Sequence, residues 1–239
     1  MKRKKSRWQK SGWKVLRRLL LWPLYCILGY WLLALVVYRF VNPPLTPLMV
    51  LRSIDQREWV QHQSVGLAAI SPPLVRAVIA AEDSRFCQHH GIDFDAVGDA
   101  LADYESSGRL RGASTITMQV ARNVFMWNGG GAVRKIVEAP LALLLDAVWP
   151  KRRIVEVYLN IAELGDGVFG AQAAARIHFH KPASALTIKE AARLAAVLPN
   201  PIRWNAARPT SYINQRTGII QNRIGQLGPL QTTCLQLNK

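Results

Sequence analysis

The chain has 239 residues, of which half are hydrophobic, and its 31 lysines and arginines against 15 aspartates and glutamates give a formal net charge of +16. It shows no repeat of fixed period and no cysteine and histidine cluster with zinc-ligand spacing, so a repeat architecture and a structural zinc site are excluded. The positive charge is unevenly distributed, because nine basic residues and no acidic ones fall within residues 1–18.

An apolar segment follows the basic stretch. Leu19 to Tyr38 contains no charged side chain, and a helix of that length crosses the ~30 Å hydrocarbon layer of a membrane. A cleaved signal peptide is the alternative, but the segment is longer than a signal core, and the following Val41-Asn42-Pro43-Pro44 offers no small-residue cleavage site. We therefore expect an uncleaved membrane anchor.

The charge asymmetry predicts the orientation of this anchor. Basic flanks stay in the cytoplasm, so we expect residues 1–18 to form a cytoplasmic tail, residues 19–38 the transmembrane helix, and the chain after Arg39 to face outward. A basic tail also suits nucleic acid, but a basic patch beside a membrane span is better explained by topology and anionic lipid. No nucleic-acid partner is expected.

Residues 39–56 are expected to form a linker, since Asn42 to Pro47 is typical of a stiff, non-helical stalk. Residues 57–227 suffice for one domain with a core, and their patterns are mostly helical. Two helical starts are clear: Thr187 to Glu190 is a capping box, and a helical stretch runs from about Thr210 to Gly225. Residues 228–239 are expected to form a frayed tail.

A helix with a cap at Ser71 and prolines in its first turn is predicted to end near Glu82. Leu74, Val78 and Glu82 follow one another at four-residue spacing, so the carboxyl group lies in line with an apolar stripe. Loss of water raises the pKa of such a carboxyl toward values useful for proton transfer. The alternative is a helix-terminal acid that pairs with Arg85 or caps a neighbouring helix.

A second helix follows a polar, glycine-bearing connection, and Ser114 is placed to cap it. Ile116, Val120 and Val124 share one side of this helix. The other side carries hydroxyl, amide and guanidinium groups, from Thr115, Gln119, Arg122 and Asn123. An ordinary solvated face is the alternative, but such faces usually carry glutamate and lysine.

A glycine-rich turn at residues 125–131 precedes a third helical stretch. Arg134 and Glu138 stand four residues apart, so they are expected to form a helical ion pair. Pro140, two residues later, is expected to kink or end this helix.

The three cysteines leave the disulfide pattern open. Cys26 lies in the apolar segment, and Cys87 and Cys234 pair only if the C-terminal tail folds back over the Glu82 region.

Together these segments resemble the peptidoglycan glycosyltransferase family, most closely its monofunctional biosynthetic transglycosylases. Five motifs in the family's order carry this resemblance: Glu82, Asp83, Phe86, His89 and Gly91; Gly112, Ser114, Thr115, Ile116, Thr117, Gln119, Arg122 and Asn123; Arg134, Lys135 and Glu138; Ile154 and Tyr158 to Asn160; Gly165, Gly170, Ala173 and Ala174. Three residues depart from the usual pattern, namely Met118, Arg122 in place of the more common lysine, and Pro140. The resemblance implies a mainly α, lysozyme-like domain behind one N-terminal transmembrane helix.

The resemblance also implies a reaction and roles for the motif residues. The 4-hydroxyl of lipid II attacks the anomeric carbon of the growing glycan strand, with inversion, and undecaprenyl diphosphate leaves. Glu82 is expected to accept the proton, and Glu138 is expected to be the second acid that positions a cation or the diphosphate. Arg122, Arg134 and Lys135 are expected to stabilise the diphosphate, while Thr115, Gln119 and Asn123 orient the acceptor or the phosphates.

The remaining motif residues and the partners follow from the same resemblance. Asp83 and Ser114 are expected near the substrate, and His89 is expected to order the motif loop. A divalent metal, Mg²⁺ or Mn²⁺, is a possible aid at the diphosphate. The expected location is the bacterial inner membrane with a periplasmic domain, where lipid II, the glycan strand and cell-wall synthesis or division proteins are the partners.

Two other functions fit a membrane-anchored helical domain. A lysozyme-like lytic enzyme also uses a catalytic glutamate, but it needs no diphosphate site. A non-catalytic envelope scaffold would use Glu82 and Arg134 only for packing. A bifunctional penicillin-binding enzyme is disfavoured, because Ser11 to Lys14 is the only Ser-x-x-Lys and no Lys-Thr-Gly occurs in the sequence.

Overall fold

The computed structural model describes residues 7–108, 112–126 and 131–235. Residues 1–6 of the basic tail and 127–130 of the glycine-rich turn lie outside the described residues. The chain divides into two compact units, Met1–Val41 and Asn42–Lys239.

The first unit contains one long helix, α1 (Arg7–Val37). Its stretch from Arg17 to Val37 is the one helix among the described residues that is long and apolar enough to cross a membrane. This stretch agrees with the expected anchor at residues 19–38. Pro23 lies inside the helix without ending it.

The second unit is mainly helical, as the sequence predicts. Its α-helices are α2 (Pro47–Gln56), α3 (Pro72–Glu82), α4 (Phe94–Ser107), α5 (Ile116–Phe125), α6 (Gly131–Val148), α7 (Lys151–Ile161), α8 (Ala171–Phe179), α9 (Ile188–Val197), α10 (Ser211–Gln226) and α11 (Pro229–Thr232). Its 3₁₀ helices are η1 (Leu67–Ala69), η2 (Ala183–Ala185) and η3 (Thr233–Leu235).

A small three-stranded sheet completes this unit. Its strands are β1 (Gln61–His62), β2 (Glu163–Gly165) and β3 (Val168–Phe169). β3 is central, parallel to β1 and antiparallel to β2.

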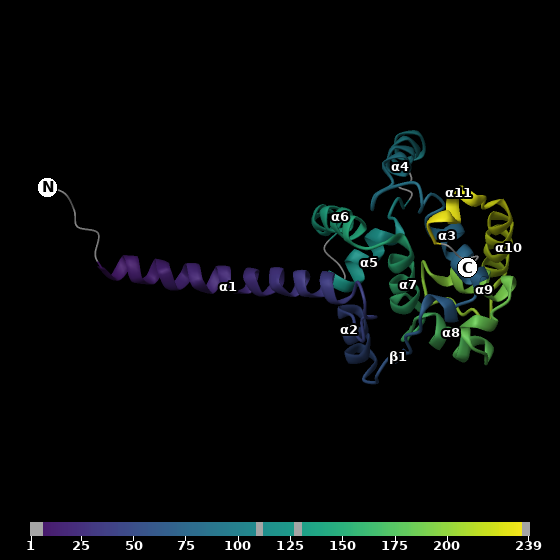
Figure 1. The fold of residues 1–239 in the computed structure, drawn as a ribbon, viewed down its shortest axis with the longest axis horizontal. Helices are drawn as coiled ribbons and strands as arrows, with labels where there is room; N and C mark the ends of the chain where they lie inside the picture. The colour runs from purple at the N-terminus through teal and green to yellow at the C-terminus, as the bar shows by residue number, and fades with distance from the viewer. Residues whose placement is uncertain (1–6, 109–111, 127–130, 236–239) are drawn as a thin grey trace. The chain divides into compact units, whose positions relative to one another are not determined.

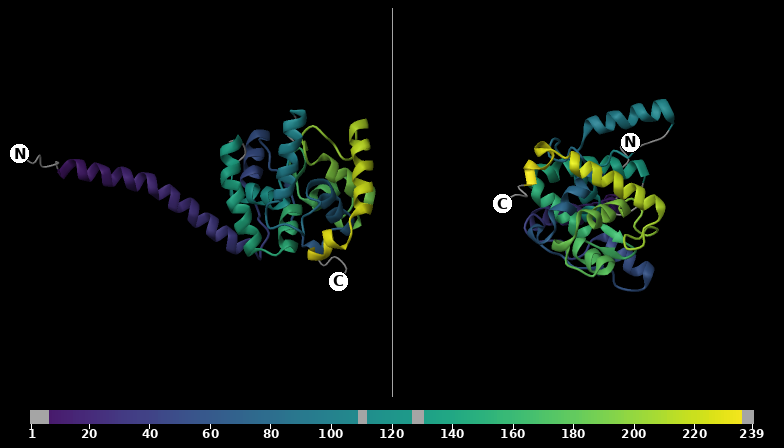
Figure 2. Two further views of the ribbon diagram at one scale, coloured as in Figure 1. Left: turned by 90° about the horizontal axis from the view of Figure 1, so that it is seen from above. Right: turned by 90° about the vertical axis from the view of Figure 1, so that its right-hand side faces the viewer.

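Two groups of helices form the core of the second unit. α3, α9 and α10 pack against one another, and α5 packs against both α6 and α7 (Figure 1). α4 projects from the rest of this unit (Figure 2), and Ala100 is its only buried residue. α3 and α5, which carry the polar residues singled out in the sequence, therefore both belong to the packed core.

Two boundaries differ from the sequence expectation. Residues 47–56, expected in the linker, form α2, because Thr46 caps the helix and Met49 is fully buried. α6 continues through Pro140 to Val148, so of the two expected effects, a kink or an end, the proline does not end the helix. Burial of Ala142 and Leu145 on the following turn compensates for the missing backbone hydrogen bond.

Residues 229–235 of the expected C-terminal tail are folded rather than frayed, and residues 236–239 lie outside the described residues. α11 and η3 occupy residues 229–235, Leu235 is fully buried, and its carbonyl accepts a hydrogen bond from Arg152 at 2.8 Å. A disulfide joins Cys234 to Cys87, across 147 residues of sequence. The C-terminus thus folds back over the loop that follows Glu82, which is the condition under which these cysteines pair.

Candidate active site

Glu82 stands at the last position of α3, where the sequence predicts it. Ser71 caps the helix by accepting from the backbone N–H of Leu74, and Pro72 opens the first turn. Leu74 and Val78 are buried below Glu82 on the same row. Burial raises the pKa of the Glu82 carboxyl, and the adjacent Asp83 charge raises it further. The carboxyl group is therefore held closer to neutrality than an exposed glutamate.

The groups that oppose this shift come from two other helices. Gln119 on α5 donates its side-chain amide to Glu82 Oε2 at 2.9 Å, and this bond lowers the pKa of Glu82. The positive charges of Arg216 on α10 and Arg122 on α5 lower it as well. Arg85 instead binds Asp93, at 2.8 Å. The alternative in which Glu82 pairs with Arg85 is therefore wrong.

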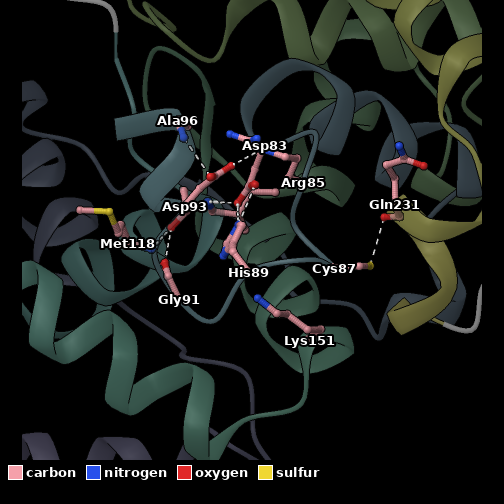
Figure 3. Close-up of polar contacts among 12 residues, drawn as sticks. Asp83, Arg85, Cys87, His89, Gly91, Asp93, Ala96, Met118, Lys151 and Gln231 are labelled. Atoms are coloured by element: carbon pink, nitrogen blue, oxygen red, sulfur yellow. Dashed lines mark hydrogen bonds and ion pairs between the residues drawn. The ribbon is translucent and has the colours of Figure 1, made fainter. Parts of the chain in front are cut away.

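Asp83 has a different environment from its neighbour. Its carboxylate binds His89 Nε2 at 2.9 Å and accepts from the backbone N–H of Ile116 at 2.9 Å (Figure 3). Both side chains of the Asp83–His89 pair are at least nine-tenths buried. Asp83 thus joins His89, in the loop after α3, to the first residue of α5.

The start of α5 corrects one detail of the sequence analysis. Thr115, not Ser114, caps this helix, because its hydroxyl accepts from the backbone N–H of Met118 and donates to the carbonyl of Gly91 at 2.6 Å. Thr115 is buried and uses its hydroxyl within the protein. It therefore joins the start of α5 to the loop at Gly91, whereas Ser114 lines a cavity.

The two partners of the Glu82–Gln119 hydrogen bond line two different cavities. The first, of about 350 Å³, is lined by Glu82 and Ser114, by Arg85 and Asp99, and by Arg223. The second, of about 220 Å³, is lined by Gln119, Arg122, Asn123, Arg134, Tyr158 and Glu163. Glu82 lines the first cavity and its bonded partner Gln119 lines the second, so this hydrogen bond links the walls of the two cavities.

The second cavity is the cationic one. Arg122 and Arg134 both line it, and Arg134 also binds Glu138 at 3.1 Å, as the four-residue spacing predicts. Burial raises the pKa of Glu138, while Arg122, Arg134 and Lys135 lower it. Lys135 is exposed and is not among the described residues that line either cavity. Its charge acts on Glu138.

The described residues do not offer a metal site at these arginines. Glu163 pairs with Arg52 at 3.1 Å and Glu138 with Arg134, so each carboxylate near the second cavity already has a cation. A different cluster, Asp83, His89 and Asp93, has ligand atoms within 4.8 Å of one another. Its acids are already bonded to His89, Arg85 and backbone N–H groups, so it does not fit a metal either.

Three residues at this site have no role assigned from the sequence. Tyr158 was noted as part of a motif but given no role, yet its hydroxyl binds Gln119 at 3.2 Å. Glu163 is the first residue of β2, just after α7, and lines the second cavity. Arg216 had no sequence signal, because its approach to Glu82 depends on α10 packing against α3.

Comparisons with known proteins agree with the motifs. A family model described as transglycosylase matches residues 49–224. The chain is 57% identical over 194 residues to the biosynthetic peptidoglycan transglycosylase of Rhodospirillum centenum, covering 81% of this chain and 84% of that protein. It is 43% identical over 212 residues to the protein of that name from Caulobacter vibrioides (89% and 92% covered) and 48% identical over 221 residues to that from Pseudomonas putida (90% and 92%).

Proposed function

The chain belongs to the transglycosylase family and is a glycosyltransferase, and we propose that it polymerises glycan strands from lipid II by inverting transfer with release of undecaprenyl diphosphate. The expected lysozyme-like helical fold class is confirmed by this membership. The observation that carries the proposal is the position of Glu82, a partly desolvated carboxyl that lines one cavity and is hydrogen-bonded to Gln119 in the wall of a second cavity lined by Arg122 and Arg134.

The first cavity suits the attacking sugar. A sugar hydroxyl is a weak nucleophile at neutral pH, so a positioned base must accept its proton as it attacks, which contributes about 10²–10⁴-fold to the rate. Glu82 lines this cavity together with Ser114. We assign the acceptor's 4-hydroxyl to this side of the carboxyl and the proton transfer to Glu82.

The second cavity suits the leaving diphosphate. As the anomeric bond breaks, negative charge builds on the diphosphate, and fixed cations stabilise that charge most effectively in a partly enclosed site. Arg122 and Arg134 provide the cations, and Gln119 and Asn123 provide amide groups. Glu138 holds Arg134 in place through their ion pair. No step in this account uses a metal.

The proposed location is the periplasmic side of the bacterial inner membrane. The basic stretch before α1 supports a cytoplasmic N-terminus, and the disulfide between Cys87 and Cys234 is of the kind that persists in oxidising compartments. Cross-linking activity is not proposed, because no Lys-Thr-Gly occurs in this sequence.

The decisive test is incubation of the purified full-length protein with lipid II. We expect glycan polymers, separated by length on gels, in samples with and without a metal chelator. Release of short fragments from insoluble sacculi without consumption of lipid II would instead identify a lytic enzyme. No reaction with either substrate would favour a scaffold.

A further inference from the structure

Tyr158 is linked to Glu82 through the side chain of Gln119. Its hydroxyl donates to Gln119 Oε1 at 3.2 Å, and Gln119 Nε2 donates to Glu82 Oε2 at 2.9 Å. The three side chains come from α7, α5 and α3. Helices that are far apart in sequence therefore contribute to one continuous chain of hydrogen bonds.

Tyr158 is the donor at one end of this chain. Its side chain is 1% exposed, and burial, followed by the Glu82 charge, raises the pKa of Tyr158 well above its ordinary value, so the hydroxyl keeps its proton. An amide has a carbonyl at one end and an N–H₂ group at the other. A donating hydroxyl therefore keeps the carbonyl of Gln119 toward Tyr158 and its N–H₂ group toward Glu82.

The orientation of the Gln119 amide affects the charge state of the Glu82 carboxyl. An N–H that donates to a carboxylate stabilises its charged form. A reversed amide would place its carbonyl oxygen against Glu82, and that contact is favourable only when Glu82 carries a proton. The Gln119 hydrogen bond is also the largest of the effects that lower the pKa of Glu82.

We propose that Tyr158 is a positioning residue for the glycosyl transfer, whose hydroxyl fixes the Gln119 amide with its N–H facing the Glu82 carboxylate. This inference rests on the proposed function for the identity of Glu82 as proton acceptor. Arg122 on α5, Arg216 on α10 and the neighbouring Asp83 also act on Glu82. These groups are unchanged when only the tyrosine hydroxyl is removed.

The test is the pH dependence of lipid II polymerisation by the full-length Tyr158→Phe protein. We expect the acid limb of the rate profile to move up by about one pH unit, the size of a lost hydrogen bond to a charged group. At alkaline pH, where Glu82 is ionised in both proteins, the two rates should converge. Tyr212→Phe, which removes an exposed hydroxyl, is the matched control and should leave the profile in place.

A second measurement needs no activity. Carbodiimides label protonated carboxyl groups, so mass spectrometry of labelled Glu82 across a pH series follows its protonation directly. In Tyr158→Phe the labelling should persist about one pH unit higher than in the wild type, and Gln119→Leu should abolish this difference between tyrosine and phenylalanine. Thermal melting of each variant confirms that the fold is retained.

The outcomes distinguish the positioning role of Tyr158 from the proposed function. Unshifted labelling and an unshifted acid limb in Tyr158→Phe would overturn the positioning role, even if wild-type protein polymerises lipid II. A shift in labelling without any polymerisation by wild-type protein would support the positioning role and reject the proposed function.

Discussion

Asp83 accepts a hydrogen bond from the backbone N–H of Ile116 at 2.9 Å, so the acid next to the proposed base holds the start of α5 against the end of α3. Gln119, one turn further along α5, then meets Glu82 at 2.9 Å. The two adjacent carboxylates thus have different tasks. Asp83 sets the distance between α3 and α5, and at that distance Glu82 accepts the hydrogen bond from Gln119.

Replacing Asp83 by asparagine should therefore lower stability as well as activity. The variant weakens the hydrogen bonds of the Asp83 carboxylate with His89 and with the backbone N–H of Ile116, and loss of a buried charged hydrogen bond costs about 1–3 kcal/mol. Thermal unfolding followed by circular dichroism measures the change. Asp103→Asn, in an exposed part of α4, is the control. Identical melting of the Asp83→Asn and wild-type proteins would show that this bond does not stabilise the fold.

Replacing Glu82 by glutamine should abolish polymerisation while stabilising the protein at neutral pH. The amide cannot accept the proton, so a loss of about 10²–10⁴-fold is expected. Because the folded pKa of Glu82 is raised, the folded state binds the proton more tightly than the unfolded state. Stability is thus lost as pH rises from the ordinary carboxyl pKa through the raised one.

The stability gain of Glu82→Gln therefore has a defined pH window. It should be largest above the raised pKa and disappear below the ordinary carboxyl pKa, where both proteins are neutral at this position. The wild-type rate should fall as pH decreases through the raised pKa. Melting temperatures and lipid II turnover across a pH series measure both effects. A glutamine variant with near-normal polymerisation would rule out Glu82 as the proton acceptor.

Variants of Arg134 and Glu138 can separate stabilisation of the diphosphate charge from stability of the fold. Arg134→Ala leaves Glu138, whose side chain is 1% exposed, without its partner, and breaking a buried pair in this way costs about 3–5 kcal/mol. Adding Glu138→Gln removes the uncompensated charge and should restore most of the melting temperature. Turnover should stay low in the double variant, by about 10²-fold, because the diphosphate still lacks a cation. Recovery of turnover with stability would mean that Arg134 acts only through packing.

The starts of α3, α9 and α10 and the four-residue row that ends at Glu82 could be predicted because they depend on local chemistry. Thr187 forms its capping box with Glu190, and Thr210 caps α10 one residue before the helix begins. The approach of Arg216 to Glu82 could not, since it follows from packing between helices more than 100 residues apart. The folded C-terminal segment was missed for the same reason. Its order comes from Cys87 and the Arg152 contact, and no local pattern encodes either.

The disulfide between Cys87 and Cys234 should stabilise the second unit. It ties α11 and η3 to the loop that carries Asp83 and His89, and loss of a native disulfide typically costs about 2–5 kcal/mol. The double variant Cys87→Ser/Cys234→Ser should therefore melt at a lower temperature than the wild type. Reductant should lower the wild-type melting temperature similarly and leave the double variant unchanged. Cys26→Ser, in α1, is the control, and insensitivity of the wild type to reductant would contradict the prediction.

Gly91 and Gly98 should respond in opposite directions to replacement by alanine. Gly91 has φ +78°, and a Cβ there would lie 2.7 Å from the carbonyl oxygen of Ala142 on α6. Strain and this clash should destabilise Gly91→Ala by about 1–2 kcal/mol or more. Gly98 lies inside α4 with no heavy atom within 4 Å of such a Cβ, so alanine should stabilise that helix by about 0.5–1 kcal/mol.

The polymerisation activities of Gly91→Ala and Gly98→Ala should differ in the same direction as their stabilities. The carbonyl of Gly91 accepts the Thr115 hydroxyl at 2.6 Å, so displacement of this residue moves the start of α5 and with it Gln119. Polymerisation should fall in Gly91→Ala and stay near the wild-type rate in Gly98→Ala. Melting curves and lipid II turnover of the pair provide the measurement. Equal melting and equal turnover would show that the loop after α3 tolerates a side chain at residue 91, and that the contact with α6 does not hold the site.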